Sequence, residues 1–170
     1  MKFPRNFPCG VVIVQHISDG FLDGLVEWLN TGCAVRIKAA QNGEEIQSGI
    51  VYLAPCGFQM RVDEERKLRL SDESNYDGHK PSGSILLESV ARIYKKGAIG
   101  VILSGMGADG AMGIKAIKEV GGVTIAQDEK TCVVFGMPKV AIEMGAVDEI
   151  LPCDKIAEEI IWMLGREVTA

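Results

Sequence analysis

The sequence has no hydrophobic run long enough to cross a membrane and no excess of positive charge. Its longest apolar runs, Ile50–Ala54 and Ile160–Leu164, are five residues long, whereas a membrane helix needs about 20. The 170 residues carry 18 Lys and Arg against 23 Asp and Glu, a net charge of −5 that argues against a nucleic-acid partner held through its phosphates. With 47% hydrophobic and 24% charged residues, the composition predicts a soluble globular protein without membrane insertion.

Cysteine and histidine are also too scattered for a metal site. The five cysteines are Cys9, Cys33, Cys56, Cys132 and Cys153. They form no Cys-x-x-Cys pair, and no secretory signal precedes them. The only histidines, His16 and His79, have no cysteine within six residues. We therefore expect free thiols, a cytoplasmic location, and neither a metal nor a cofactor.

Short β-branched runs alternate with helical patterns along the whole chain. Strands are predicted at residues 11–14, 35–38, 50–54, 99–103, 123–126 and 147–151, and helices at 21–29, 81–94, 111–120, 136–144 and 154–164. Caps for the first and last helices are expected at Ser18–Asp19 and Asp154. The alternation predicts a doubly wound α/β domain over residues 1–170, with a mostly parallel sheet flanked by helices.

One segment departs from the parallel pattern. Residues 58–62 and 67–70 flank the charged turn Asp63–Arg66 and predict an exposed antiparallel β-hairpin, inserted near residues 58–70.

The segment Ser104–Gly110 lies between a predicted strand and a predicted helix. Its glycines satisfy the G-x-G-x-x-G spacing of a dinucleotide-binding loop, and Asp128 follows about where a ribose-binding acid is expected. Asp109, however, would place a carboxylate next to the pyrophosphate at a helix N-terminus. The alternative is a tight glycine-rich turn in which Asp109 caps the helix that follows.

Two polar residues follow predicted parallel strands, where open α/β sheets place functional groups. His16 and Asp109 could be the base and the orienting acid of a hydrolase. Alternatively, His16 only forms a hydrogen bond with a loop carbonyl, and Asp109 only caps a helix. The second histidine, His79, precedes Ser82. This segment is either a substrate-binding loop or a helix start capped by Ser82 or Ser84.

Taken together, these motifs resemble the catalytic domain of CheB-type chemotaxis methylesterases. The segments that carry the resemblance are Val11–His16, Gly49–Pro55, His79–Ser82, Val101–Ala111, Gln127–Pro138 and Ala141–Ile150. The resemblance implies a protein-glutamate methylesterase, which hydrolyses glutamyl methyl esters on the cytoplasmic helices of chemoreceptors and deamidates glutamines. It assigns His16 as the general base and Asp109 as the acid that orients it.

The same resemblance places Met106 and Gly107 in the active-site loop, where backbone N–H groups are candidates for stabilising an oxyanion. His79 and Ser82 belong to the substrate loop. Under this interpretation the glycine-rich segment is a turn that presents Asp109, rather than a nucleotide site.

The chain also departs from the family pattern. The motif Gly-x-Ser-Thr-Gly-Gly, which carries the nucleophilic serine in the family, does not occur in the sequence, and Ser18, Ser82, Ser84 and Ser104 match other positions. Gln59 stands where a family histidine is expected, and Ser84 where an acid is expected.

These departures lead us to expect an N-terminally incomplete catalytic domain without a receiver domain. Its exposed sheet edge would be covered by rearrangement or by self-association. The alternative function is that of a non-catalytic relative that binds receptors.

Overall fold

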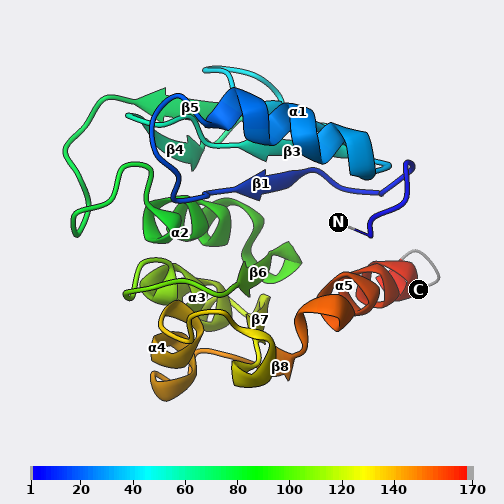
Figure 1. Ribbon diagram of the computed structural model, residues 1–170. Coiled ribbons are helices and arrows are strands. Elements are labelled where there is room, and N and C mark those ends of the chain that lie inside the picture. The colour runs from blue at the N-terminus through cyan, green and yellow to red at the C-terminus, as the bar shows by residue number, and fades with distance from the viewer. Residues whose placement is uncertain (1, 168–170) are drawn as a thin grey trace. The chain divides into compact units, whose positions relative to one another are not determined.

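The computed structural model describes residues 2–167 (Figure 1). The chain divides into two compact units, Met1–Ser82 and Gly83–Ala170, which we describe separately. The expectation of a single domain over residues 1–170 stays a prediction.

The first unit contains a three-stranded parallel sheet in the order β1-β3-β2. Its elements are β1 (Val11–Ile13), α1 (Leu22–Gly32), β2 (Arg36–Ala39) and β3 (Ile50–Leu53). The central strand is buried, and its Val51 lies opposite Val11 on one side and Ile37 on the other. The side chain of Asn30 fixes α1 to β2 through two hydrogen bonds with the backbone of Ile37. Its Nδ2 donates to the carbonyl of Ile37 at 2.8 Å, and its Oδ1 accepts from the backbone amide of Ile37 at 2.9 Å.

The predicted hairpin is present as β4 (Gln59–Val62) and β5 (Leu68–Ser71), which pair antiparallel. The expectation that it is exposed is wrong. Met60, Val62 and Leu68 are fully buried, since alternate residues of both strands turn one face into the core. Residues 64–66 of the charged turn are exposed, as the composition predicts for the tip of the hairpin. There Asp63 accepts hydrogen bonds from the amides of Glu65 and Lys67, each at 2.9 Å.

The second unit contains a second parallel sheet, in the order β6-β7-β8. Its elements are α2 (Gly83–Tyr94), η1 (Lys95–Gly97), β6 (Ile99–Ile102), α3 (Ala111–Glu119), β7 (Val123–Gln127), η2 (Glu129–Thr131), α4 (Met137–Glu143), β8 (Glu149–Leu151) and α5 (Cys153–Glu167). A core that includes Ile102, Ile114 and Ala126 joins this sheet to α3 and α4. Helix α2 packs closely on α3, and Gly113 permits this approach. A Cβ at Gly113 would lie only 2.4 Å from the Cβ of Leu87.

The α/β class, the mostly parallel strands flanked by helices and the hairpin near residues 58–70 are thus confirmed. Two predicted caps are wrong. The N-cap of α1 is Phe21, while Asp19 accepts from the neighbouring amide of Gly20, and Asp154 lies inside the first turn of α5. All five cysteines are free thiols. Within residues 2–167, no helix has both the length and the apolar character needed to span a bilayer.

Candidate active site

The structure brings the only two histidines of the chain together within the first unit. His16 is exposed and lies three residues after the end of β1, while His79 lies in the segment that follows β5. Their rings stack, with centroids 4.4 Å apart and an angle of 21° between the planes. Sequence reasoning treated the two histidines separately, and it gave no signal that residues 63 positions apart would be in contact.

The segment that carries His79 is held by Gln59 of β4. The side chain of Gln59 is fully buried, and its Nε2 donates to the carbonyl of His79 at 2.9 Å. Its Oε1 accepts from the amide of Ser82 at 2.8 Å. Gln59 was noted in the sequence only as a departure from the family, yet it fixes both ends of the predicted substrate loop. Ser82 itself is fully buried.

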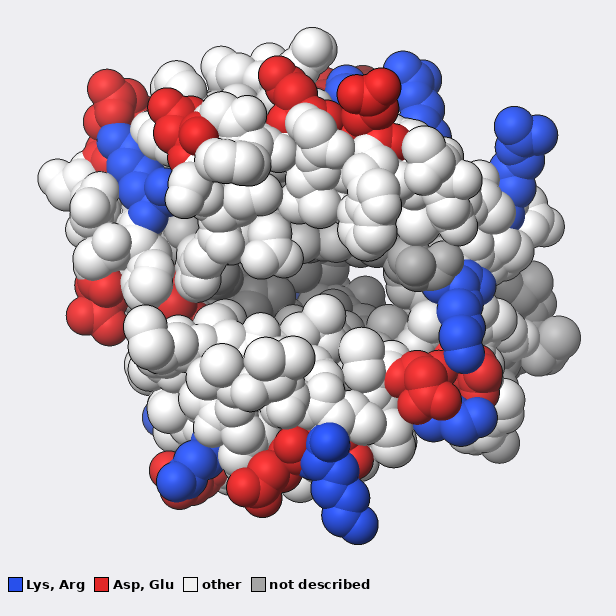
Figure 2. Space-filling view, viewed as in Figure 1, with Lys and Arg blue, Asp and Glu red and all other residues white. Residues whose placement is uncertain are grey.

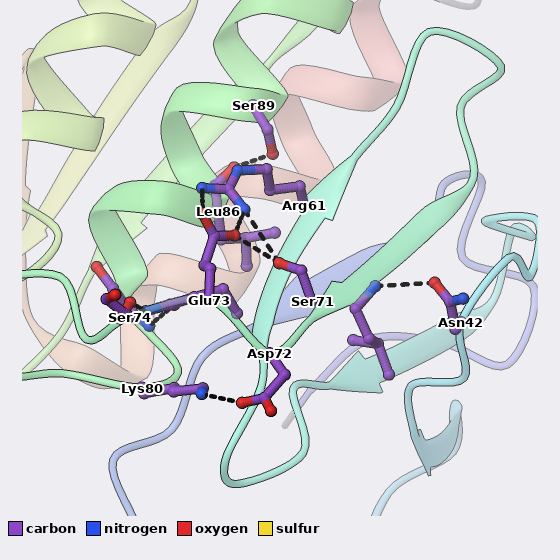
Figure 3. Close-up of polar contacts among 12 residues, drawn as sticks. Asn42, Arg61, Ser71, Asp72, Glu73, Ser74, Lys80, Leu86 and Ser89 are labelled. Carbon is purple, nitrogen blue, oxygen red and sulfur yellow. Dashed lines mark hydrogen bonds and ion pairs between the residues drawn. The ribbon is translucent and has the colours of Figure 1, made fainter.

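Charged side chains hold the start of the same segment (Figure 3). Lys80 forms an ion pair with Asp72, and Arg61 of β4 forms one with Glu73. Glu73 also accepts a hydrogen bond from the hydroxyl of Ser71 at 2.5 Å. The hydrogen bonds from Arg61 and Ser71 hold the pKa of Glu73 below its usual value. The chain between β5 and Pro81 is therefore tied to the hairpin at several points.

In the second unit, Asp109 is only 4% exposed and caps a helix. Its Oδ2 accepts from the amide of Gly83 at 2.6 Å, and its Oδ1 accepts from the amide of Ser84 at 3.1 Å. Both amides lie at the N-terminus of α2, where the helix dipole favours a negative charge. The alternative interpretation expected Asp109 to cap the following helix, α3. That is wrong, because the N-cap of α3 is Gly110, which makes no side-chain cap.

The loop from Gly105 to Gly110 presents two backbone amides. Met106 is 82% exposed, and Gly107 has a φ of +91°, a conformation that glycine adopts without strain. In the part of the chain that the structure describes, the amides of Met106 and Gly107 donate no hydrogen bond to a protein group. Amides in this state are suited to bind an oxyanion.

The same loop fits a dinucleotide poorly. The amide of Gly110, at the N-terminus of α3, donates to Oγ of Ser84 at 2.8 Å and is not free to bind a phosphate. Asp128, the expected ribose-binding acid, accepts instead from the amide of Thr131 at 3.0 Å and from its hydroxyl at 2.5 Å. The amide of Gly110 and the carboxylate of Asp128, two groups that the nucleotide hypothesis requires, thus already have structural partners.

Charges of both signs are intermixed on the surface. On the face in Figure 2, basic and acidic side chains lie beside one another. Ion pairs such as Lys118 with Asp148, at 3.0 Å, and Lys67 with Glu65, at 2.8 Å, show the same intermixing.

Comparisons with known proteins show to which family the chain is similar. A protein-family model described as CheB methylesterase matches residues 1–160. The protein-glutamate methylesterase/protein-glutamine glutaminase of group 3 operon of Rhizobium meliloti (strain 1021) is 48% identical over 155 residues, which are 91% of this chain and 44% of that protein. The protein-glutamate methylesterase FrzG of Myxococcus xanthus is 44% identical over 161 residues, which are 94% of this chain and 48% of that protein.

The chain thus spans slightly less than half the length of these two curated relatives. A solved structure, the crystal structure of the Thermotoga maritima CheB methylesterase catalytic domain, matches with a TM-score of 0.93 at 39% identity. That match covers 95% of this chain and 87% of the Thermotoga chain. The chain therefore belongs to the CheB methylesterase family.

Proposed function

We propose that the protein hydrolyses glutamyl methyl esters of chemoreceptors, with His16 as the general base and Asp109 as the acid that orients it. The observation that carries the proposal is the family match over residues 1–160, which includes both residues. Their positions support it: His16 follows the parallel strand β1, and Asp109 follows the parallel strand β6. The carboxyl ends of parallel strands are where α/β proteins place functional groups.

In this reaction the nucleophile is the serine of the family motif Gly-x-Ser-Thr-Gly-Gly, which does not occur in these 170 residues. Its hydroxyl attacks the ester carbonyl and gives its proton to His16. The amides of Met106 and Gly107 donate to the oxygen of the tetrahedral intermediate. His16 then gives the proton to the methoxy group, which leaves as methanol, and a water molecule hydrolyses the acyl-enzyme in the same way. With a glutamine side chain as substrate, the leaving group is ammonia.

His79 and Ser82 belong to the substrate loop in this proposal. His79 packs against the ring of His16. Ser82 acts through its backbone position, because its side chain is fully buried. The protein works in the cytoplasm, on the cytoplasmic helices of methylated receptors, and its five free thiols are consistent with a reducing compartment.

The alternative function is a receptor-binding module without turnover. The observation that favours it is that the family motif Gly-x-Ser-Thr-Gly-Gly does not occur in the 170 residues. Of the four serines considered, Ser82 and Ser84 are buried, and the hydroxyl of Ser104 bonds to backbone groups. Ser18 is exposed, but it stands between Ile17 and Asp19 and lacks the glycine-flanked context of the motif. The two functions differ in one measurable product, methanol.

The test uses the protein as its host produces it. Its intact mass is compared with 18.3 kDa, and its N-terminal sequence is read. Methanol release is then measured with a chemoreceptor cytoplasmic domain methylated on glutamate, for the wild type, His16→Ala and the surface control Lys115→Ala. We expect His16→Ala to lose turnover by about 1,000-fold or more and to keep receptor binding, while Lys115→Ala behaves as the wild type.

The outcomes separate the hypotheses. Receptor binding without methanol release by the wild type would establish the binding module. Turnover that survives His16→Ala would remove His16 from the mechanism. A protein that neither binds nor demethylates receptors would overturn both functions.

A further inference from the structure

The hydroxyl of Ser104 binds three backbone groups of a distant segment. Ser104 lies just beyond the end of β6, and its Oγ accepts from the amide of Val133 at 3.1 Å and from the amide of Val134 at 3.0 Å. It donates to the carbonyl of Val134 at 3.2 Å. These bonds use the one donor and both acceptor positions of a serine hydroxyl. We call residues 131–137 the clamp segment.

The backbone of Ser104 is tied to the start of the clamp segment through Gln127, which is buried at the end of β7. Oε1 of Gln127 accepts from the amide of Ser104 at 2.9 Å. Its Nε2 donates to the carbonyl of Thr131 at 2.8 Å. One side chain thus connects the position of Ser104 to the first residue of the clamp segment.

Gly105 continues the contact along the backbone. Its amide donates to the carbonyl of Val134 at 3.0 Å. Its carbonyl accepts from the amide of Gly136 at 3.1 Å and from the amide of Met137 at 2.9 Å. A Cβ at Gly136 would lie 2.6 Å from the carbonyl oxygen of Gly105 and 3.1 Å from the amide nitrogen of Gly107. The clamp segment therefore lies directly against the backbone of the Gly105–Gly110 loop.

Side-chain burial contributes little to holding the middle of this segment. Val133 is 94% exposed, and Val134 is 44% exposed. Segments with few buried apolar contacts are held chiefly by their hydrogen bonds. At Val133 and Val134, the hydroxyl of Ser104 is the acceptor for both amides.

We propose that Ser104 is a positioning residue: its hydroxyl locks the clamp segment against the Gly105–Gly110 loop and so fixes the amides of Met106 and Gly107. This inference rests on the proposed function, in which those amides bind the oxyanion. Oxyanion donors act only when they are held at the correct distance, and a displacement of about 1 Å can reduce a rate about 100-fold. Ser104 acts here through backbone geometry and does not contact the substrate.

The first test measures geometry without any activity. Backbone amide exchange is followed by NMR for the wild type, Ser104→Ala and Ser104→Thr, with Ser89→Ala as the matched control. Ser89 also uses its hydroxyl to bond a backbone carbonyl, that of Leu86 at 2.7 Å, but it lies within α2. We expect Ser104→Ala to speed exchange at Val133 and Val134 by about tenfold or more and to shift the amide signals of Met106 and Gly107.

Ser104→Thr retains a hydroxyl, so its exchange rates at Val133 and Val134 and its amide signals at Met106 and Gly107 should match those of the wild type. Ser89→Ala should change neither the exchange rates nor the signals. Unchanged exchange and unchanged amide signals in Ser104→Ala would overturn the proposal, whether or not the protein has esterase activity.

The second test measures catalysis in the protein as its host produces it. Ser104→Ala should lower kcat for methanol release by about tenfold or more while KM stays within about twofold, and Ser104→Thr should recover most of kcat. A loosened loop with unchanged kcat would show that Ser104 has only a structural role, and would overturn the positioning role. Absence of turnover in the wild type would overturn the proposed function, and the exchange experiment would still decide whether Ser104 fixes the loop.

Discussion

The carboxylate of Asp109 accepts hydrogen bonds from two amides at the N-terminus of α2. One of these amides belongs to Ser84. The hydroxyl of Ser84 in turn accepts a hydrogen bond from the amide of Gly110. The residue proposed as the orienting acid is therefore fixed on a helix terminus before any substrate binds. Such a carboxylate keeps its orientation during a reaction, because moving it would break a helix cap.

We predict that Asp109→Ala lowers the free energy of unfolding by about 1–2 kcal/mol, because the amides of Gly83 and Ser84 lose their acceptor in a buried place. Asp109→Asn keeps one side-chain oxygen as an acceptor and should lose less. Urea denaturation without substrate measures both effects separately from catalysis. If Asp109→Ala is as stable as the wild type, the cap contributes nothing to folding.

The sequence offered candidate site residues but not their contacts. His16 and Asp109 are candidates because each follows a predicted strand, and the resemblance to the family assigns their roles. The bonds from Asp109 to Gly83 and Ser84 span 26 and 25 residues of sequence, and no local pattern specifies them. The stacking of His16 on His79 is equally non-local. Contacts of this kind depend on the completed fold, whereas periodicity and capping signals extend over only a few residues.

Strand β4 contributes a buried glutamine that holds the His79 segment. We predict that Gln59→Leu lowers stability by about 2 kcal/mol or more, because the amide of Ser82 and the carbonyl of His79 lose their side-chain partner. It should also disturb the stacking of the two histidine rings. Since the chain has only two histidines, imidazole NMR signals report on this directly.

His79→Ala provides the reference, because it removes the ring current of His79 from the signals of His16. The signals of His16 in Gln59→Leu should move toward their positions in His79→Ala. Signals that stay at the wild-type positions would show that Gln59 is not needed for the stacking.

Asp148 links β7 to α3. It accepts from the amide of Thr124 at 2.9 Å and from its hydroxyl at 2.7 Å, and it lies 3.0 Å from Nζ of Lys118. Burial acts to raise the pKa of Asp148, but the hydrogen bonds from Thr124 and Lys118 outweigh it and hold the pKa below its usual value.

Because this pKa is lower in the folded than in the unfolded protein, Asp148 stabilises the fold above the unfolded pKa of about 3.9. That contribution disappears as the pH falls through the lower, folded pKa. We therefore predict that melting temperatures fall less steeply between pH 5 and pH 2 in Asp148→Asn than in the wild type. Parallel curves for Asp148→Asn and the wild type would contradict the assignment.

At the level of strands and helices, the sequence predicted most of the fold. The buried parallel strands were found because they are short continuous apolar runs, as in Ile50–Leu53. The hairpin was found from its turn, but its burial was missed, because the charged residues 63–66 dominated the local composition. Helix starts were the least accurate, since Asp19 offers a capping side chain that the chain uses in a turn instead.

The outer strands of the two parallel sheets differ in charge. In the order β1-β3-β2, the outer strand β2 carries Arg36 and Lys38, whereas β1 has no charged residue. In the order β6-β7-β8, the outer strand β8 carries Glu149, whereas β6 has none. Charged residues on an edge strand oppose pairing with another chain. Within residues 2–167, β1 and β6 are therefore the outer strands of the parallel sheets that lack a charged residue.

We predict that the 170-residue chain self-associates through these edges at concentrations of tens of micromolar, because unpaired N–H and C=O groups on an apolar edge favour strand addition. Sedimentation velocity should give a mass above 18.3 kDa that falls on dilution. Val12→Lys places a charge on the β1 edge and should shift the equilibrium toward the monomer, whereas Ala39→Lys on the already charged β2 edge should change it little. A chain that stays monomeric over the whole concentration range would show that these edges do not pair between molecules.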